Sequence, residues 1–553
     1  MKTRHFLVFL VSAGILAMGC RTTVNKTSVV PKPNVLAANT VETNFNGNTP
    51  ISDLRAASDH GNPVAEAILG HFMVRGIRVP QDVEQGLRLL QSSADQGFSH
   101  AMAELGSLYL YGKWVPQDYS KALYWLNQAA DKNDSDAELN LGVCYQNGQG
   151  VETNFVTAAG WYRRAAEQTN YFAMKNLGVL YMHGTGVPTN FETAIFWLTP
   201  AAEKGKNARA MYDLGILGEN GLLGTNSPVK AFNWYQQSAD LGDPLGCWRL
   251  AVCYHYGKGV PQDQTRYFFW AGEAAAQGVA EAQFFLGEAY RTGNGMPTNM
   301  DLATTWYRRA ATNGYPDAYY NLALGYLADK TNQEAQVEAM RWMLQAAQHD
   351  HREAQFQYAL ACLRGTSVPK DVEQWREWLR RAAEAGWPKA EFMLSQAYLG
   401  GWAPFMKDEI EGEKWLERAA EHGNFEAQCK LAIRLMQGVG VPRDATQAVK
   451  WWRWAAERGY PQAQNDLGYA LQTGDAGTVD LVEACKWLQL AAKAGEEKAK
   501  INLAGLSAKL TDDQRREASQ RANDFQPQPM PQLNPVQRNG DAGTPIVDTP
   551  SDQ

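Results

Sequence analysis

The sequence contains few residues of the kinds that build catalytic and metal sites. It has only 9 histidines and 7 cysteines in 553 residues, and it contains neither an HExxH nor a GxSxG motif. The one close histidine pair, His349 and His351, falls between two apolar helical patterns, where a solvent-exposed turn is the simpler interpretation. We therefore expect no catalytic residue, no cofactor and no bound metal.

An excess of positive charge is also absent. The formal net charge is −7, whereas nucleic-acid-binding proteins usually carry a strongly basic surface. We therefore expect no nucleic-acid partner. Beyond the N-terminus, no apolar run reaches the roughly 20 residues that a membrane-spanning helix needs.

The first twenty residues have the composition of an export signal. Basic residues precede an apolar run over residues 6–18, and small residues and Cys20 follow. The segment resembles the signal of bacterial lipoproteins, although Ala17 stands where these signals usually have leucine. We expect a signal peptide over residues 1–19, lipidation of Cys20, and export to the bacterial cell envelope, with the chain facing the periplasm or the cell exterior. An ordinary cleavage site would give an exported chain without the lipid.

Two segments lack hydrophobic periodicity. Residues 20–50 are rich in Thr, Asn and Pro, which predicts a flexible linker with an average span of about 30 Å. Residues 526–553 are rich in Pro and Gln, which predicts a disordered tail. These segments flank a repetitive region, residues 51–525.

The region between them repeats itself at a constant period. Leu-Gly pairs such as that at residues 105–106 recur every 36 residues, with two steps of 37. Eleven of the 18 tryptophans follow the same steps: Trp125, Trp161, Trp197, Trp234, Trp270, Trp306, Trp342, Trp378, Trp415, Trp451 and Trp487. A fixed period of this length indicates a solenoid, in which each repeat is stabilised by its neighbours.

Each repeat contains two helical patterns joined by a turn. The turn begins at a glycine, often continues with a proline, and ends at an Asp or Asn, as in GKGVPQD at residues 257–263. Glycine suits the left-handed residue after a helix, proline cannot continue the helix, and Asp or Asn caps the next one. A phosphate-binding loop would need a Ser or Thr after the lysine, so we interpret these segments as turns.

These features resemble Sel1-like repeats, which are relatives of the tetratricopeptide repeat. The segments ALYWLNQAADKND (122–134), WYRRAAEQT (161–169) and AEFMLSQAYLGG (390–401) carry the resemblance. It implies an all-α fold: a right-handed α-solenoid of about twelve 36-residue helix-turn-helix repeats, followed by a C-terminal capping helix pair. It also implies a concave groove lined by the first helices, an adaptor role, and no catalytic site shared by the family.

The repeats contain six cysteines: Cys144, Cys247, Cys253, Cys362, Cys429 and Cys485. Cys247 and Cys253 lie six residues apart on one helical pattern and cannot form a disulfide, so we expect buried free thiols. Some Sel1-like proteins with a disulfide in each repeat are described as β-lactamase-like. That pattern is absent here, which makes a β-lactamase-like hydrolase the weakest functional alternative.

Two positions of the first helix are candidates for ligand binding. At the position before the leucine, the resemblance implies that asparagines face the groove, and the matching residues are Asn140, Asn176 and Asn321. One residue earlier, six successive repeats carry an aromatic side chain: Tyr212, Trp248, Phe284, Tyr320, Phe356 and Phe392. These aromatics either form a ligand-binding row along the groove or pack between neighbouring first helices.

The sequence as a whole favours a non-catalytic envelope scaffold that binds protein or peptide partners in the groove of the solenoid. A scaffold that binds peptidoglycan or exopolysaccharide is the alternative, because rows of aromatic side chains also suit sugars. In either case we expect contact with the membrane only through the lipid anchor.

Overall fold

All regular secondary structure in the described part of the chain is α-helical. The computed structural model describes residues 45–475 and 477–529, and these residues form 27 helices, α2 to α28. They divide into two units, of which the first ends at Pro297 and the second begins at Thr298. None of these helices is both long and apolar enough to cross a membrane. The predicted all-α repeat fold is confirmed.

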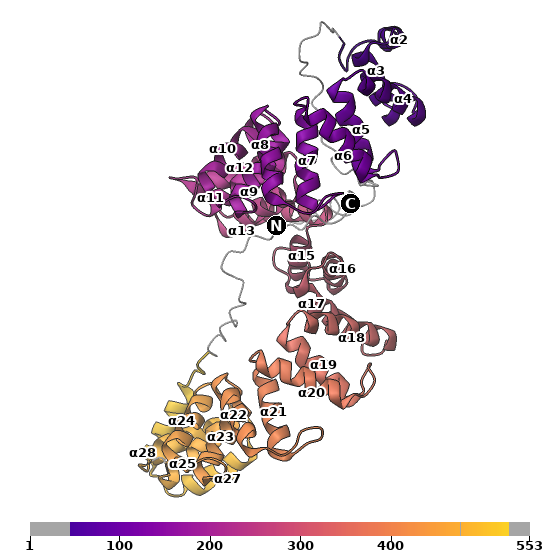
Figure 1. Ribbon diagram of the computed structural model, residues 1–553. Coiled ribbons are helices and arrows are strands. Elements are labelled where there is room, and N and C mark those ends of the chain that lie inside the picture. Colours follow the sequence, from indigo (N-terminus) through magenta and orange to yellow (C-terminus); the bar gives the residue numbers. More distant parts are fainter. Residues whose placement is uncertain (1–44, 476, 530–553) are drawn as a thin grey trace. The chain divides into compact units, whose positions relative to one another are not determined.

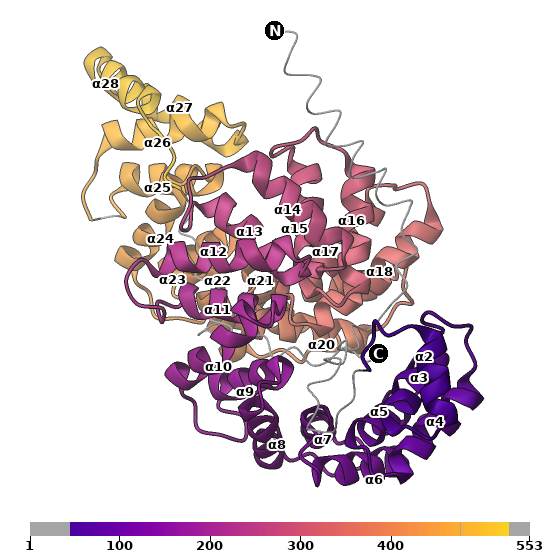
Figure 2. The same cartoon turned by 90° about the horizontal axis from the view of Figure 1, so that it is seen from above.

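The first unit consists of helix pairs that follow one another along the chain (Figure 1). In the view of Figure 2, the pairs from α3 to α10 follow a curved path. After α2 (Ile51–Asp59), the first helices of the repeats are α3 (Pro63–Arg75), α5 (Ser99–Tyr111), α7 (Ser135–Asn147), α9 (Tyr171–His183), α11 (Ala208–Glu219), α13 (Pro244–Tyr256) and α15 (Ala280–Thr292). The second helices are α4 (Val83–Asp95), α6 (Tyr119–Ala130), α8 (Phe155–Glu167), α10 (Phe191–Glu203), α12 (Ser227–Asp240) and α14 (Gln264–Ala276).

The second unit continues the same alternation. It begins with a second helix, α16 (Met300–Thr312). Its first helices are α17 (Pro316–Leu327), α19 (Arg352–Arg364), α21 (Pro388–Gly400), α23 (Phe425–Gln437), α25 (Pro461–Thr473) and α27 (Glu497–Ser507). The other second helices are α18 (Gln333–Gln348), α20 (Val372–Glu384), α22 (Glu409–Glu421), α24 (Ala445–Glu457) and α26 (Leu481–Lys493), and α28 (Asp512–Asn523) follows the last repeat.

The turn between the two helices follows from its residue types. In repeat two, Gly112 ends α5 in the left-handed conformation, with φ at 64°. Asp118 then accepts the backbone N–H of Lys121 at 3.0 Å and begins α6. The GKGVPQD segment has the same structure, because Gly257 ends α13 with φ at 71° and Asp263 caps α14. The interpretation of this segment as a turn is confirmed.

Small residues allow the two helices of a repeat to approach closely. A Cβ atom on Gly106 would lie 2.6 Å from Cγ of Leu126, and a Cβ atom on Gly142 would lie 2.5 Å from Cδ1 of Tyr162. Such distances leave no room for a larger side chain in the Leu-Gly pair. One apolar cluster runs from Leu139 to Leu217 through three successive repeats, so the core is shared between repeats, as expected for a solenoid.

Repeat eight departs from the common turn. Its turn contains neither the glycine nor the proline, and the repeat register places Ala335 at the capping position. The register is misleading here, because the side chain of Asn332 caps α18 by accepting the N–H of Ala335 at 3.1 Å. The second helix therefore begins early and has 16 residues.

The last repeat is covered by α27 and α28, the predicted capping pair, and both helices pack on α26. Phe525 then lies edge-on to Trp487, with 5.3 Å between the ring centroids. The backbone N–H of Gln528 donates to the carbonyl oxygen of Glu457 at 2.8 Å. The first residues of the predicted tail are thus packed on the repeats, while residues 530–553 lie outside the described part of the chain.

Candidate functional site on the first helices

The asparagine position joins neighbouring repeats. Asn140 is buried, and its side-chain oxygen accepts the hydroxyl of Tyr111, from the preceding first helix, at 3.0 Å. Asn176 and Asn321 are half-buried. Asn140 therefore lies in the interface between repeats two and three. Ligand binding by the three asparagines stays a prediction.

At the aromatic position of the first unit, Trp248 lies between neighbouring first helices. Trp248 is buried, its indole N–H donates to a carboxylate oxygen of Glu281 at 2.7 Å, and its ring centroid lies 5.4 Å from that of Phe285. Both partners belong to the next first helix, α15. Tyr212 and Phe284 are half-buried. The contacts of Trp248 favour packing over ligand binding as its main role.

The aromatic position of the second unit makes similar contacts. Tyr320 is half-buried and stacks on His351, the capping residue of α19, with 4.3 Å between the ring centroids. Phe356 is buried, and Phe392 packs against an apolar cluster from α22 and α23. His351, one half of the histidine pair noted in the sequence, therefore has a structural role.

Other side chains of the first helices are exposed, and the repeat periodicity did not single them out. Tyr256 near the end of α13 is 60% exposed, and Phe172 near the start of α9 is 37% exposed. Asn176 lies one helical turn after Phe172. The position of Tyr256 holds a second exposed tyrosine in repeat two, Tyr111, but other residue types in most repeats, and the position of Phe172 holds no other aromatic except His100, so comparison of the repeats gave only a weak signal for them.

A buried carboxylate joins α3 and α5. Glu104 occupies the same repeat position as Asn140, and it forms ion pairs with Arg75 and with His71, the latter at 3.2 Å. Burial alone would raise the pKa of Glu104, but hydrogen bonds and charge interactions with His71 and Arg75 outweigh burial and lower the pKa to about 2. In repeats two and three, this position thus connects adjacent first helices.

Glu104→Gln is expected to remove a pH-dependent part of the stability. The folded-state pKa of about 2 lies below the ordinary 4.5, so the stabilisation by the ionised carboxylate is present above pH 4.5 and is lost as the pH falls towards 2. We expect the variant to be less stable than the wild type by about 2–3 kcal/mol at pH 5.5, and the difference to vanish near pH 2. Urea unfolding across this range measures it, and a constant difference would contradict the ion-pair explanation.

Arginine pairs on several second helices recur at one repeat position, which predicts a solvated helix surface. Both arginines of each pair are exposed, but the second one also stacks on the tryptophan three residues earlier. In Arg164, for example, Cζ lies 4.6 Å from the ring centroid of Trp161. Arg164 in addition forms an ion pair with buried Glu138 at 2.7 Å. The same stacking joins Arg309 to Trp306, Arg381 to Trp378 and Arg418 to Trp415.

All six cysteines of the repeats are buried and free, which confirms that prediction. Burial raises the pKa of each of these thiols, to about 12 for Cys144, Cys247 and Cys253. A thiol with so high a pKa is a poor nucleophile at neutral pH. These cysteines therefore give no support to a hydrolase.

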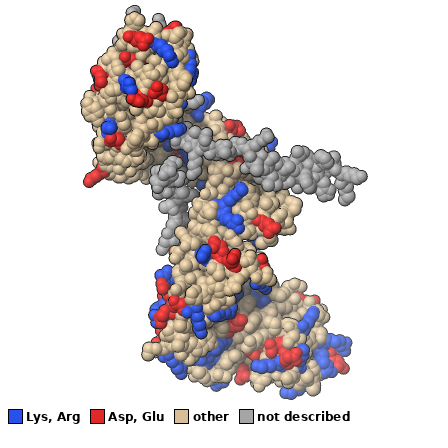
Figure 3. Space-filling view, turned by 90° about the vertical axis from the view of Figure 1, so that its right-hand side faces the viewer, with Lys and Arg blue, Asp and Glu red and all other residues tan. Residues whose placement is uncertain are grey.

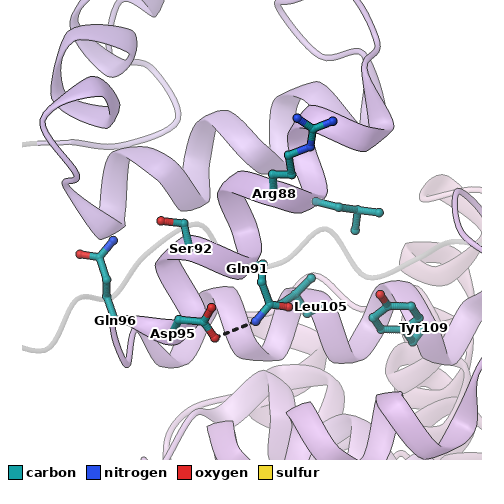
Figure 4. Close-up of a pocket in the computed structure, with 8 residues that line it drawn as sticks. Arg88, Gln91, Ser92, Asp95, Gln96, Leu105 and Tyr109 are labelled. Carbon is teal, nitrogen blue, oxygen red and sulfur yellow. Dashed lines mark hydrogen bonds between the residues drawn. The ribbon is translucent and has the colours of Figure 1, made fainter.

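An open hollow lies between α4 and α5 (Figure 4). It is lined by Leu87, Arg88, Gln91, Ser92, Asp95, Gln96, Leu105 and Tyr109. Within it, the side-chain amide of Gln91 donates to Asp95 at 2.7 Å. Most of the lining comes from a second helix and none of the predicted ligand-binding residues contributes, so the hollow does not coincide with the predicted groove.

Acidic and basic side chains are interspersed on the face that Figure 3 shows. No large area of that face carries a single sign of charge. Nucleic-acid recognition requires a basic stripe or patch, and this face offers none.

Comparison with known proteins identifies the repeats. The family model described as the Sel1 repeat matches twelve segments: residues 63–98, 99–134, 135–170, 172–206, 208–243, 244–279, 280–315, 316–351, 352–387, 388–424, 425–460 and 461–496. The chain belongs to the Sel1 repeat family. Each Sel1 repeat of this protein is one first helix, its turn and the following second helix, from α3 and α4 to α25 and α26.

Two crystal structures are among those to which this chain is similar. The protein c5321, a protective antigen present in uropathogenic Escherichia coli strains, is 30% identical, with 86% of this chain and 94% of that chain covered and a TM-score of 0.53. A Sel1 repeat protein from Oxalobacter formigenes is 26% identical, with 65% of this chain and 97% of that chain covered and a TM-score of 0.39. A search of curated proteins gave no match. Sel1 repeat proteins generally mediate protein–protein interactions.

Proposed function

We propose that this Sel1 repeat protein is a non-catalytic scaffold of the bacterial cell envelope that binds a protein or peptide along the first helices of its repeats. The observation that carries the proposal is the mixed polar and aromatic surface of the first helices in the first unit, where the exposed side chains of Phe172 and Tyr256 and the half-buried side chain of Asn176 lie. Aromatic side chains serve as anchors in interfaces, and an asparagine can both donate to and accept from a peptide backbone.

A second feature of the same surface supports a peptide ligand. Three residues after the asparagine position, four successive first helices carry a half-buried aliphatic residue: Val143, Val179, Ile216 and Val252. Residues three apart are neighbours on a helix surface, so each aliphatic residue adjoins the side chain at the asparagine position. Apolar contacts beside polar groups suit an extended peptide, whose side chains and backbone groups alternate.

The test is capture of a partner from an envelope extract by the full chain and by a triple variant, Phe172→Ala, Asn176→Ala and Tyr256→Ala. Phe172 and Tyr256 are exposed, and Asn176 is half-buried and hydrogen-bonded to Tyr162, so we expect the variant to fold with a modest loss of stability from Asn176→Ala. Removal of three contacts of about 1 kcal/mol each should weaken binding of the captured protein at least tenfold. The purified partner and calorimetry give the affinity.

The matched control removes exposed aromatic side chains from second helices of the same unit: Tyr124→Ala, Phe196→Ala and Phe269→Ala. We expect it to bind as the wild type does. Equal weakening in the control would place the partner on the second helices. Retention of the wild type on purified peptidoglycan, with no protein captured, would favour the polysaccharide alternative.

The envelope location is supported by the sequence alone, because residues 1–44, with Cys20 among them, lie outside the described part of the chain. We expect Cys20 to be lipidated after removal of the signal peptide. Growth with a labelled fatty acid should label the wild type and leave Cys20→Ala unlabelled. Equal labelling of both proteins, or no label on the wild type, would contradict the anchor and leave the scaffold proposal standing.

A further inference from the structure

Three potential metal ligands converge where repeats two and three meet in the first unit. His100 lies near the start of α5, Asp134 is the capping residue of α7, and Asp136 lies in the first turn of α7. One ligand atom from each residue lies within 4.8 Å of the other two. All three residues are half-buried, so the cluster is partly removed from water.

The protein holds both carboxylates in place and leaves oxygen atoms free to bind a ligand. One oxygen of Asp134 accepts the backbone N–H groups of Asp136 and Ala137, each at 3.1 Å. The other oxygen, on a side chain that is only 10% exposed, faces Nδ1 of His100 at 4.0 Å and accepts no hydrogen bond from the described residues. The side-chain amide of Asn170 donates to one oxygen of Asp136 at 2.9 Å. Such outer contacts commonly orient the ligands of a metal site.

The equivalent positions of another pair of repeats carry a different charge arrangement. At the equivalent positions of repeats five and six, Arg209 forms an ion pair with Asp243 at 3.3 Å, and Leu245 stands at the position of Asp136. There, one cation neutralises one carboxylate. In repeats two and three, two carboxylates share one imidazole, and no Lys or Arg of the described residues lies within 4.0 Å of either. Two like charges this close favour a bound cation.

We propose that His100, Asp134 and Asp136 bind one divalent metal ion of the Zn²⁺ class and thereby join α5 to α7. One imidazole and two carboxylates are a donor set that Zn²⁺ accepts, with water as the fourth ligand. Ligand atoms on a common tetrahedral Zn²⁺ lie about 3.4 Å apart, so His100 and Asp134, 4.0 Å apart, must approach by about 0.6 Å, and the other separations must close by at most about 1.4 Å. The proposal is independent of the partner proposed for the first helices.

The test is titration of the full chain, without an affinity tag and stripped of metal, with ZnCl₂ by calorimetry under reducing conditions. We expect one site per chain in the wild type. Asp136→Asn and His100→Gln should each weaken it at least tenfold. The control Arg209→Gln breaks the equivalent ion pair of repeats five and six, and it should leave Zn²⁺ binding unchanged.

Thermal melts provide the second measurement. Zn²⁺ should raise the melting temperature of the wild type and of Arg209→Gln, EDTA should reverse the rise, and Asp136→Asn should show none. Asp136→Asn keeps the shape of the side chain and removes one of two like charges, so it decides the outcome even if His100→Gln folds poorly. No Zn²⁺ binding by the wild type, or unchanged binding by Asp136→Asn, would overturn the proposal and leave a plain His100–Asp134 ion pair.

Discussion

Replacement of Trp487 with alanine is expected to lower the free energy of unfolding of the second unit by about 3–5 kcal/mol. The Trp487 side chain is 2% exposed and belongs to an apolar cluster that extends from α23 to α28. Its indole N–H has no hydrogen-bond partner within the described residues, so its contribution is packing. The ring also supports Phe525, and its loss should free the segment that follows α28.

The effect of Trp487→Ala should be local, because each repeat of a solenoid contacts mainly its neighbours. Amide hydrogen exchange should become faster in α24 to α28 and stay unchanged in the first unit. Phe196→Ala is the control, since its side chain is 66% exposed, and it should change stability by no more than about 0.5 kcal/mol. An unchanged denaturation midpoint for Trp487→Ala would contradict a core role for this tryptophan of the repeat series.

Trp248→Ala is expected to destabilise the first unit by about 3–4 kcal/mol. The side chain is buried between α13 and α15, where its ring contacts Phe285 and its indole N–H donates to Glu281. Trp248→Phe keeps most of the packing and loses the hydrogen bond, so it should be less stable than the wild type by only about 1 kcal/mol.

Melting curves of the two Trp248 variants separate packing from ligand binding. Tyr256→Ala is a control in the same helix, α13, and its exposed side chain should contribute less than about 0.5 kcal/mol. If Trp248→Ala melted as the wild type does but no longer bound the partner, the aromatic position would be a ligand-binding row along the groove.

The repeat architecture could be predicted from the sequence because each of its determinants is local. Gly112 ends one helix because its backbone adopts the left-handed conformation, Asp118 begins the next because its side chain caps it, and the 36-residue period repeats the pattern. The small residue at Gly106 follows from the same register, since it meets Leu126 of the same repeat. Repeat eight is the exception: the repeat period predicts the cap at Ala335, but Asn332, three residues earlier, caps the helix.

The candidate sites could not be predicted to the same degree, because their contacts join residues of different repeats and different types. The resemblance to tetratricopeptide repeats implies that Asn140 faces the groove, but the repeat register gives no sign that the hydroxyl of Tyr111, 29 residues earlier, donates to it. His100 and Arg209 occupy the same repeat position, but their partners differ. His100 meets Asp136 only because the next repeat happens to carry an aspartate there. Contacts of this kind arise from packing and leave no periodic signal.

Hydrogen exchange of the full chain, with and without its captured partner at saturation, tests the proposed role of the first helices most directly. Binding along these helices predicts slower exchange in α7, α9, α11 and α13, with little change in α6, α8, α10 and α12. Slower exchange confined to the second helices or to the turns between helices would contradict the proposal.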